Sequence, residues 1–365
     1  MARRRTPYFA FEYVEGGAED EVALRRNRAA FEELRFAPRT LVDTSSRTTA
    51  TSLFGAPLSL PLVVAPTGLN GVLRRGADRM LAHAAARAGV PFCLSTVSNL
   101  LPGDVATEGA RLWMQLYVFK DLAITARVLE RAEATGCEAL VFTTDANVFG
   151  GREWHLRAYR GPGQLSLRSL IDVLRHPRWL MEVGIPGLPR FENVVEFLPE
   201  HARSARAGVT VIPSLFAPTI SWDDVARLRD RWRRRLIIKG ILRPEDAEHA
   251  VRLGCDGIVL TNHGGRQLDA CVAPIEVLPE IARAVRERIT ILVDSGVRRG
   301  SDIAKAVALG AHAVMVGRAT LYGVAAGGEA GALRAIEILR SEFDRQLGLL
   351  GCRSVAELTP DLLHR

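Results

Sequence analysis

Short apolar segments alternate with longer amphipathic segments from residue 62 onward. The apolar segments are rich in Val, Leu and Ile, which is typical of parallel strands that are buried on both faces. We expect eight strands, at Leu62–Ala65, Pro91–Leu94, Leu112–Leu116, Ala139–Thr143, Leu236–Lys239, Gly257–Thr261, Ile289–Val293 and Ala313–Val316.

The segments between these strands have helical periodicity, and four of them stop at a glycine, as helix C-termini prefer. Repeated strand–helix units of this kind predict an α/β fold, a (β/α)8 TIM barrel. A doubly wound open sheet is the alternative, but the Gly-x-Gly-x-x-Gly motif that would follow its first strand is missing. The expected helices are Asp78–Ala88, Leu122–Thr135, Trp222–Arg234, Glu245–Leu253, Val277–Glu287 and Ser301–Leu309.

Two parts of the chain fall outside this repeat. Residues 1–61 precede the first strand, and we expect an N-terminal extension packed on the barrel, within a single domain that spans residues 1–365. The interval after the fourth strand is far longer than a βα connection needs. Residues 146–221 are therefore predicted to be an inserted loop region.

Residues 168–190 of the insertion interleave apolar side chains with arginines. We interpret them as an active-site lid or a subunit-packing loop. The alternative is a peripheral membrane contact, with Trp179 and leucines in the headgroup region and Arg175 and Arg178 on anionic lipid. The short apolar face and Pro177 favour the first interpretation.

Charge and cysteine content narrow the function classes. A formal net charge of +7 suits anionic small molecules, a membrane surface or nucleic acid. No zinc-finger spacing, RNA-binding signature or long basic run is present, so we expect no nucleic-acid partner. The five cysteines are scattered without a Cys-x-x-Cys pair, which predicts reduced thiols in the cytoplasm and no metal site. We find neither a signal peptide nor an apolar stretch of about 18 residues that could span a bilayer.

Polar side chains follow every predicted strand, where a (β/α)8 barrel builds its active site. His263 and Arg266 follow the sixth strand. A base that takes up a proton near neutral pH, beside a guanidinium that binds a carboxylate, suits chemistry next to a carboxylate. Asp145, after the fourth strand, is placed to orient the imidazole, and Arg152 is a second candidate for carboxylate binding.

The loops after the last two strands predict a phosphate site. Gly296 and Arg298 follow the seventh strand, and Gly317 and Arg318 follow the eighth. Small residues let backbone N–H groups approach a phosphate, and arginines add charge-assisted hydrogen bonds. Lysine is rare in the chain, so Lys239 at the end of the fifth strand stands out as a compact point charge.

These segments together resemble the FMN-dependent 2-hydroxy-acid dehydrogenases and oxidases, and the mandelate-oxidising members most closely. The resemblance covers nearly the whole chain in order, and the motif after the sixth strand is highly specific. It rests on Tyr13–Asp20, Pro66–Gly71, Gln115–Tyr117, Thr143–Asp145, His176–Trp179, Lys239–Gly240, Asn262–Asp269, Asp294–Gly300 and Gly317–Gly323.

The resemblance implies FMN as the cofactor and oxidation of an (S)-2-hydroxy acid, aromatic and mandelate-like, to the 2-keto acid, with a quinone or oxygen as electron acceptor. It also implies a homotetramer. His263 would be the base with Asp145 behind it, Arg152 and Arg266 would bind the carboxylate, and Tyr13 and Tyr117 would contact the substrate. The cofactor contacts it implies are Pro66, Thr67, Gly68, Ser95, Gln115, Thr143, Lys239, Asp294, Gly296, Arg298, Gly317 and Arg318. Hydrogen transfer as a proton or as a hydride is compatible with this set.

Two other functions stay open at this point. One is a flavin-dependent oxidase or oxidative decarboxylase that acts on a carrier- or peptide-linked 2-hydroxy acid. The other is a barrel that binds phosphate ligands without catalysis. The second is disfavoured, because several titratable side chains gather at strand ends.

Overall fold

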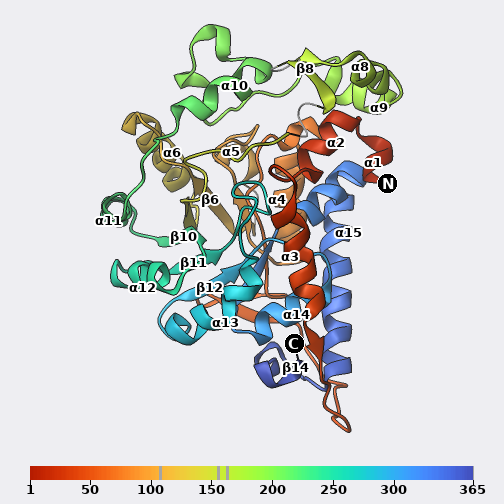
Figure 1. Cartoon of the computed structure of the whole chain (residues 1–365), viewed down its shortest axis with the longest axis vertical. Coiled ribbons are helices and arrows are strands. Elements are labelled where there is room, and N and C mark those ends of the chain that lie inside the picture. The colour runs from red at the N-terminus through yellow and green to blue at the C-terminus, as the bar shows by residue number, and fades with distance from the viewer. Residues whose placement is uncertain (107–108, 154–156, 162–163, 365) are drawn as a thin grey trace.

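The expected strands form a closed parallel barrel in the computed structural model, which describes residues 1–106, 109–153, 157–161 and 164–364 (Figure 1). Neighbouring strands follow the order β10-β11-β12-β13-β4-β5-β6-β7, so the barrel closes between the first and the last of them in sequence. This topology confirms the (β/α)8 prediction. The strands are β4 (Leu62–Val64), β5 (Phe92–Leu94), β6 (Leu112–Leu116), β7 (Ala139–Thr143), β10 (Arg235–Ile241), β11 (Gly257–Leu260), β12 (Thr290–Val293) and β13 (Ala313–Val316).

Both faces of each barrel strand are covered, which explains the unbroken apolar segments. Val63, Val141 and Leu292 are among the side chains that fill the interior, and Trp113 is the largest of them. The alternate positions pack against the surrounding helices. A hairpin of β2 (Thr51–Leu53) and β3 (Ala56–Leu58) closes the end of the barrel at which the strands begin. There the Phe54 ring lies 5.9 Å from the Trp113 ring.

The helices follow the predicted positions with shifts at their ends. The α11 helix stops three residues early because Trp232 leaves the helical conformation, becomes buried and donates from Nε1 to the Arg235 carbonyl (3.0 Å). The α13 helix starts earlier than expected, with Pro274 in its first turn. The helices around the barrel are α4 (Ala77–Ala88), α6 (Leu122–Ala134), α11 (Trp222–Arg231), α12 (Pro244–Arg252), α13 (Pro274–Val285), α14 (Gly300–Ala308) and α15 (Arg318–Leu350), the last kinked at Gly327 and Gly328.

The N-terminal extension runs along one side of the barrel. It contains α1 (Ala2–Arg5), α2 (Tyr8–Glu15), α3 (Val22–Glu33) and β1 (Arg35–Phe36), and β1 pairs with β14 (Leu363–His364). In Figure 1, α2 lies at the upper end of this side, directly below α8 and α9 of the insertion.

The insertion covers the upper end of the barrel and contains β8 (Tyr159–Gly161), β9 (Gln164–Leu165), α8 (Leu167–Leu174), α9 (Pro177–Trp179) and α10 (Ala205–Leu215). The structure corrects one detail of the membrane alternative: Trp179 does not face outward. Its side chain is buried, its Nε1 donates to the Val72 carbonyl (2.7 Å), and its ring lies 5.5 Å from that of Phe9. Within the described residues, no helix has the length and apolar character that crossing a bilayer requires.

Candidate active site

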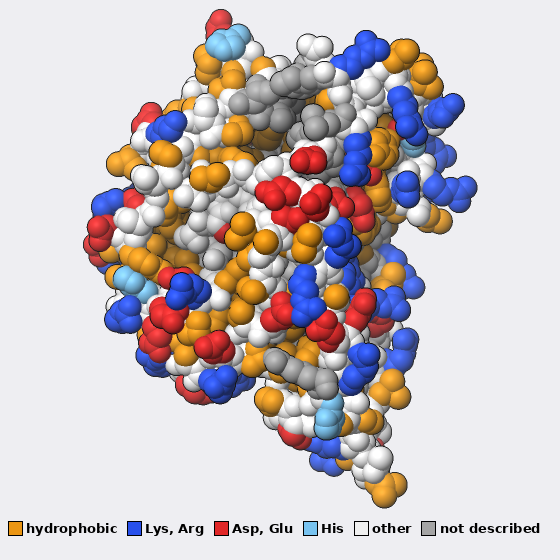
Figure 2. Space-filling view, viewed as in Figure 1, with side chains coloured by type: hydrophobic (Ala, Val, Ile, Leu, Met, Phe, Trp, Pro, Cys, Tyr) orange, Lys and Arg blue, Asp and Glu red, His pale blue; other side chains and the backbone are white. Residues whose placement is uncertain are grey.

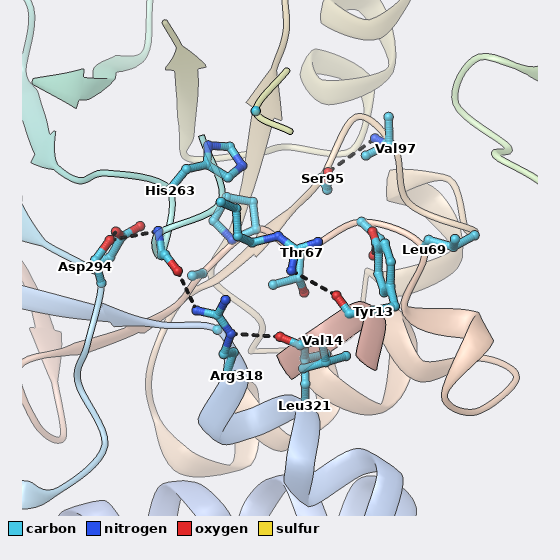
Figure 3. A pocket seen from close by; sticks show the side chains of 18 of the residues that line it. Tyr13, Val14, Thr67, Leu69, Ser95, Val97, His263, Asp294, Arg318 and Leu321 are labelled. Carbon is cyan, nitrogen blue, oxygen red and sulfur yellow. Dashed lines mark hydrogen bonds between the residues drawn. The ribbon is translucent and has the colours of Figure 1, made fainter. Parts of the chain in front are cut away.

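A cavity of about 530 Å³ lies at the carboxyl ends of the barrel strands, a size usual for cofactor and small-molecule sites. Figure 3 shows Tyr13, His263 and Arg318 around it, from three separate parts of the chain. Fifteen residues named from the sequence line the cavity: Tyr13, Pro66, Thr67, Gly68, Ser95, Tyr117, Arg152, Lys239, His263, Arg266, Asp294, Gly296, Arg298, Gly317 and Arg318.

Three predicted site residues are not part of this lining. Asp145 lies behind His263, to which it is hydrogen bonded. Gln115 donates from Nε2 to Thr143 Oγ1 (3.1 Å) and accepts from Ser95 Oγ (3.2 Å), so it supports a lining residue from behind. Direct cofactor contacts of Gln115 and Thr143 therefore stay predictions.

His263 and Asp145 form a pair, with 3.0 Å between Nδ1 and Oδ1. Because Asp145 engages Nδ1, Nε2 is the ring nitrogen available to a substrate. The His263 backbone has φ of 58°, in the left-handed region, and its N–H donates to Thr261 Oγ1 (2.9 Å). Such a conformation in a residue other than glycine is costly and is concentrated at functional sites.

Burial sets the protonation states of this pair. Burial lowers the pKa of His263 and Lys239 lowers it further, while Asp145 offsets only part of the effect. Burial alone would raise the pKa of Asp145, but His263 and Lys239 outweigh it and hold that pKa below its usual value. At neutral pH the pair is therefore a neutral imidazole beside a carboxylate, which is the form that accepts a proton.

A pH profile tests this assignment. Because the base must be unprotonated, we expect kcat/KM to rise with pH through an apparent pKa below the ordinary 6.5 of histidine and to level off before neutrality. Asp145→Asn removes an interaction that raises the His263 pKa, so the rising limb should move to lower pH. Stopped-flow measurement of flavin reduction across the pH range gives the rising limb of the wild type and that of the variant. A limb that moves to higher pH in the variant would contradict the assignment.

Lys239 provides a buried positive charge at the cavity wall. Its Nζ lies 3.4 Å from Asp294 Oδ2 and 3.4 Å from Thr261 Oγ1. Burial lowers the pKa of Lys239, but Asp294 and Asp145 outweigh it and raise that pKa above its usual value, so the ammonium stays charged. The register shift of β10 beside Lys239 requires Gly240, since φ is +124° there and an added Cβ would lie 2.4 Å from Thr144 Oγ1.

Arg266 and Arg152 bring two guanidinium groups to the cavity. Arg266 Nη1 donates to the carbonyls of Tyr13 (2.9 Å) and Gly16 (2.8 Å), and burial together with Arg152 and Arg318 lowers the pKa of Arg266 to about 9. Arg152 Nε is buried without a hydrogen-bond partner among the described residues. Buried cations that repel one another favour an anion in this part of the cavity.

Two tyrosines complete this side of the site. Tyr13 Oη donates to the Gly68 carbonyl (3.0 Å), in the loop that follows β4. Burial raises the pKa of Tyr117 to about 12, so its hydroxyl keeps its proton and can donate. The Tyr117 ring lies 4.9 Å from that of Phe216.

The opposite end of the cavity combines arginines with a helix start. Gly317 precedes the first residue of α15, and backbone N–H groups at such a position favour phosphate. Arg318 donates from Nε to the Val14 carbonyl (2.7 Å) and from Nη1 to the Gly264 carbonyl (2.8 Å) (Figure 3). Its hydrogen bonds therefore hold the end of α2 and the loop after β11, while its charge lies at this end of the cavity. Gly296 must be glycine, since an added Cβ would lie 2.3 Å from the Asn27 carbonyl oxygen.

Sequence reasoning missed the support that α3 gives to the site. Asn27 and Asn262 exchange amide hydrogen bonds of 2.8 and 2.7 Å, which fixes the backbone next to His263. Arg28 donates to Asp302 Oδ2 (2.7 Å) and to the Gly296 carbonyl, which orders the predicted phosphate loop. These contacts join residues more than 200 positions apart, so no local sequence pattern predicts them.

An apolar part of the cavity was also missed. It comes mainly from the insertion, where aromatic residues follow no strand or helix period. Its members are Leu69, Val97, Phe149, Phe191, Ile212, Pro213 and Phe216.

Comparison with known proteins decides the family. A family model described as FMN-dependent dehydrogenase matches residues 2–365. The chain belongs to this family. It is 41% identical to the (S)-mandelate dehydrogenase of Pseudomonas putida, over 100% of this chain and 92% of that protein. It is 42% identical to an L-lactate dehydrogenase of Pectobacterium atrosepticum, over 99% of this chain and 94% of that protein.

Solved structures agree with this assignment. The crystal structure of the monotopic membrane protein (S)-mandelate dehydrogenase superimposes with a TM-score of 0.92 at 40% identity and covers 100% of this chain and 96% of that one. A mandelate oxidase with (S)-4-hydroxymandelic acid gives a TM-score of 0.84 at 36% identity, over 100% and 96% of the two chains. The protein is thus an FMN-dependent enzyme of the 2-hydroxy-acid dehydrogenase family.

The cavity fits FMN by the chemistry of its lining. One end has glycines and arginines suited to a phosphate, and Lys239 adds a buried positive charge to the cavity wall. The pKa of Arg318 is lowered to about 10 by burial and by Arg298, as expected where cations face each other across a site for an anion. Bound FMN supplies the two-electron acceptor that oxidation of an alcohol needs.

Proposed function

We propose that this FMN-dependent dehydrogenase oxidises an (S)-2-hydroxy acid with an aromatic, mandelate-like side chain to the 2-keto acid. The observation that carries the proposal is one cavity in which a neutral histidine base, two guanidinium groups and an apolar wall meet. Arg152 and Arg266 bind the carboxylate, and the hydroxyl groups of Tyr13 and Tyr117 contact the hydroxyl or carboxylate oxygens of the substrate. His263 takes up one proton at Nε2, and Asp145 stabilises the imidazolium that forms.

The apolar wall favours an aromatic side chain over a methyl group. Tyr117, Phe149 and Phe216 form a cluster with ring separations of 4.9 and 5.7 Å, and Ile212 and Pro213 of α10 also line the cavity. A phenyl group fills such a site and gains aromatic contacts, whereas lactate leaves it to water. The L-lactate dehydrogenases among the relatives define the competing substrate.

A substrate comparison tests the proposal. Under anaerobic conditions, (S)-mandelate should bleach the flavin band with a kcat/KM at least about tenfold above that for L-lactate, since loss of aromatic contacts costs on the order of 1–2 kcal/mol. Phe216→Ala should lower kcat/KM for mandelate by a similar factor and leave that for lactate nearly unchanged. Equal losses for both acids, or a preference for lactate in the wild type, would contradict an aromatic site.

The alternative chemistry is oxidation or oxidative decarboxylation of a carrier- or peptide-linked hydroxy acid. The structural support for this alternative is that the insertion forms one wall of the cavity, where a larger substrate could be contacted. Mass spectrometry of the product separates the outcomes, because the main proposal yields a 2-keto acid with all its carbon atoms. A quinone or oxygen would then reoxidise the flavin, and the reoxidation rate in air distinguishes them.

A second proposal concerns a peripheral contact with the cytoplasmic face of a membrane. Helix α8 and the following turns expose several apolar side chains, and Arg168, Arg175 and Arg178 of the same segment are also exposed. Figure 2 shows this mixture of apolar and basic side chains at the upper right, over α8 and α9. The related (S)-mandelate dehydrogenase is described as a monotopic membrane protein. The apolar members are Leu167, Leu170, Ile171, Leu174, Met181, Ile185 and Leu188.

Flotation with anionic phospholipid vesicles tests the contact. The wild type should float with the vesicles, and a variant with Leu170→Ser, Ile171→Ser and Leu174→Ser should bind at least about tenfold more weakly, because it loses most of the inserted apolar area. Leu349→Ser, at an exposed leucine of α15, is the matched control. A wild type that stays at the bottom of the gradient would favour the lid or subunit-packing interpretation. In that case, the molar mass measured by light scattering decides whether the proposed homotetramer forms.

A further inference from the structure

Helix α2 joins the insertion to the active site, and its N-terminal end lacks a local cap. Pro7 precedes the helix without a capping side chain, and no acidic residue lies in the first turn. Asp172 of α8 takes this place from 164 positions away: its Oδ2 accepts a 2.6 Å hydrogen bond from the Tyr8 backbone N–H. A carboxylate there satisfies an otherwise free donor and complements the positive end of the helix dipole.

The C-terminal end of α2 is held by the arginines of the active site. Arg266 donates to the carbonyls of Tyr13 and Gly16, and Arg318 donates to those of Val14 (2.7 Å) and Gly16 (3.1 Å). Guanidinium groups complement the negative end of the dipole. The helix is thus fixed at one end by a carboxylate of the insertion and at the other by two cavity residues.

Aromatic packing fixes α2 between these ends. Phe9 is buried, and its ring lies 5.5 Å from that of Trp179 and 6.3 Å from that of Tyr159, both in edge-to-face geometry. About one turn further along the helix, Tyr13 reaches the cavity and donates to the Gly68 carbonyl. A displacement of α8 is therefore passed along a short, packed helix to Tyr13.

We propose that Asp172 is a positioning residue for substrate binding, because it anchors the helix that places Tyr13 and the main-chain acceptors of Arg266. Asp172 itself does not line the cavity. Its other oxygen lies 3.8 Å from His176 Nδ1, within the insertion. This inference rests on the proposed roles of Tyr13 and Arg266 in binding the 2-hydroxy acid.

Steady-state kinetics of the holoenzyme give the first test. Asp172→Ala should raise KM for (S)-mandelate about three- to tenfold, as expected for one lost charged cap, and change kcat by less than about twofold. Asp172→Asn keeps an acceptor oxygen and should recover most of the affinity. In a Tyr13→Phe background, Asp172→Ala should raise KM much less, because both substitutions weaken the contact between Tyr13 and the substrate. Glu196→Ala is the matched control, since this insertion carboxylate pairs with Arg131 of α6 instead of α2.

Hydrogen exchange gives a second readout that does not need turnover. Asp172→Ala should speed amide exchange along the whole of α2, including residues 13–16 at the far end, whereas loss of a purely local cap would affect only the first turn. The inference is overturned if exchange changes in the first turn alone, or if the KM effects of Asp172→Ala and Tyr13→Phe are additive. A wild type inactive on every 2-hydroxy acid refutes the proposed function, and the exchange experiment then still decides whether Asp172 anchors α2.

Discussion

Replacing His263 with glutamine is expected to leave a yellow protein whose flavin is no longer bleached by substrate. Glutamine cannot take up the proton, and loss of a general base usually costs about 10²- to 10⁴-fold in rate. The predicted cofactor contacts are other residues of the cavity, so FMN content should stay close to that of the wild type. Anaerobic stopped-flow reduction by (S)-mandelate measures the effect.

His201→Gln is the control for this variant, because His201 lies on the surface of the insertion. It should reduce its flavin at the wild-type rate. Retention of more than about a tenth of the rate in His263→Gln would show that another group accepts the proton. That result would remove His263 from the mechanism and leave the proposed roles of Arg152 and Arg266 unaffected.

Lys239→Met is expected to have the second large effect, on stability and on cofactor retention together. The substitution leaves Asp294 buried without its cation, and removal of one partner from a buried ion pair costs about 3–5 kcal/mol. It also removes the positive charge from the cavity wall, so the purified protein should contain little FMN. Chemical denaturation and the flavin absorbance of the purified protein give the two measurements.

The double variant Lys239→Met with Asp294→Asn separates these effects. Removing both charges should restore most of the free energy of unfolding, because no unpaired ion is left. Flavin reduction should not recover, since the cation is still missing. Lys120→Met, at an exposed lysine, should behave like the wild type. Recovery of reduction in the double variant would mean that Lys239 serves stability alone.

The barrel could be predicted because its strands are covered on both faces. Val63 faces the interior while its neighbours Leu62 and Val64 face the helices, so all three are apolar and the segment is unmistakable. Helix ends were less predictable where tertiary contacts decide them. Trp232 ends α11 through burial and a hydrogen bond to Arg235, and neither is visible in a helical period.

The site residues likewise fall into those that the sequence predicts and those that depend on tertiary packing. His263 and Arg318 follow strands and Lys239 lies near the end of one, and the geometry of a parallel barrel brings such positions together without any knowledge of loops. Phe191 and Ile212 come from the insertion, whose path depends on packing that no short-range pattern encodes. The membrane alternative placed Trp179 outward because tryptophan is common at membrane interfaces, but its ring packs against Phe9 and its Nε1 donates to the Val72 carbonyl inside the protein.

Closure of the barrel also bears on how the protein is made. Leu62 of β4 pairs with Val314 of β13, so β4 leaves the ribosome long before the strand that covers its outer edge exists. During that interval β4 presents unpaired backbone groups flanked by Leu and Val, the kind of edge that joins other chains. Efficient production should therefore depend on chaperones that bind nascent chains, and slower growth at low temperature should raise the yield of soluble enzyme.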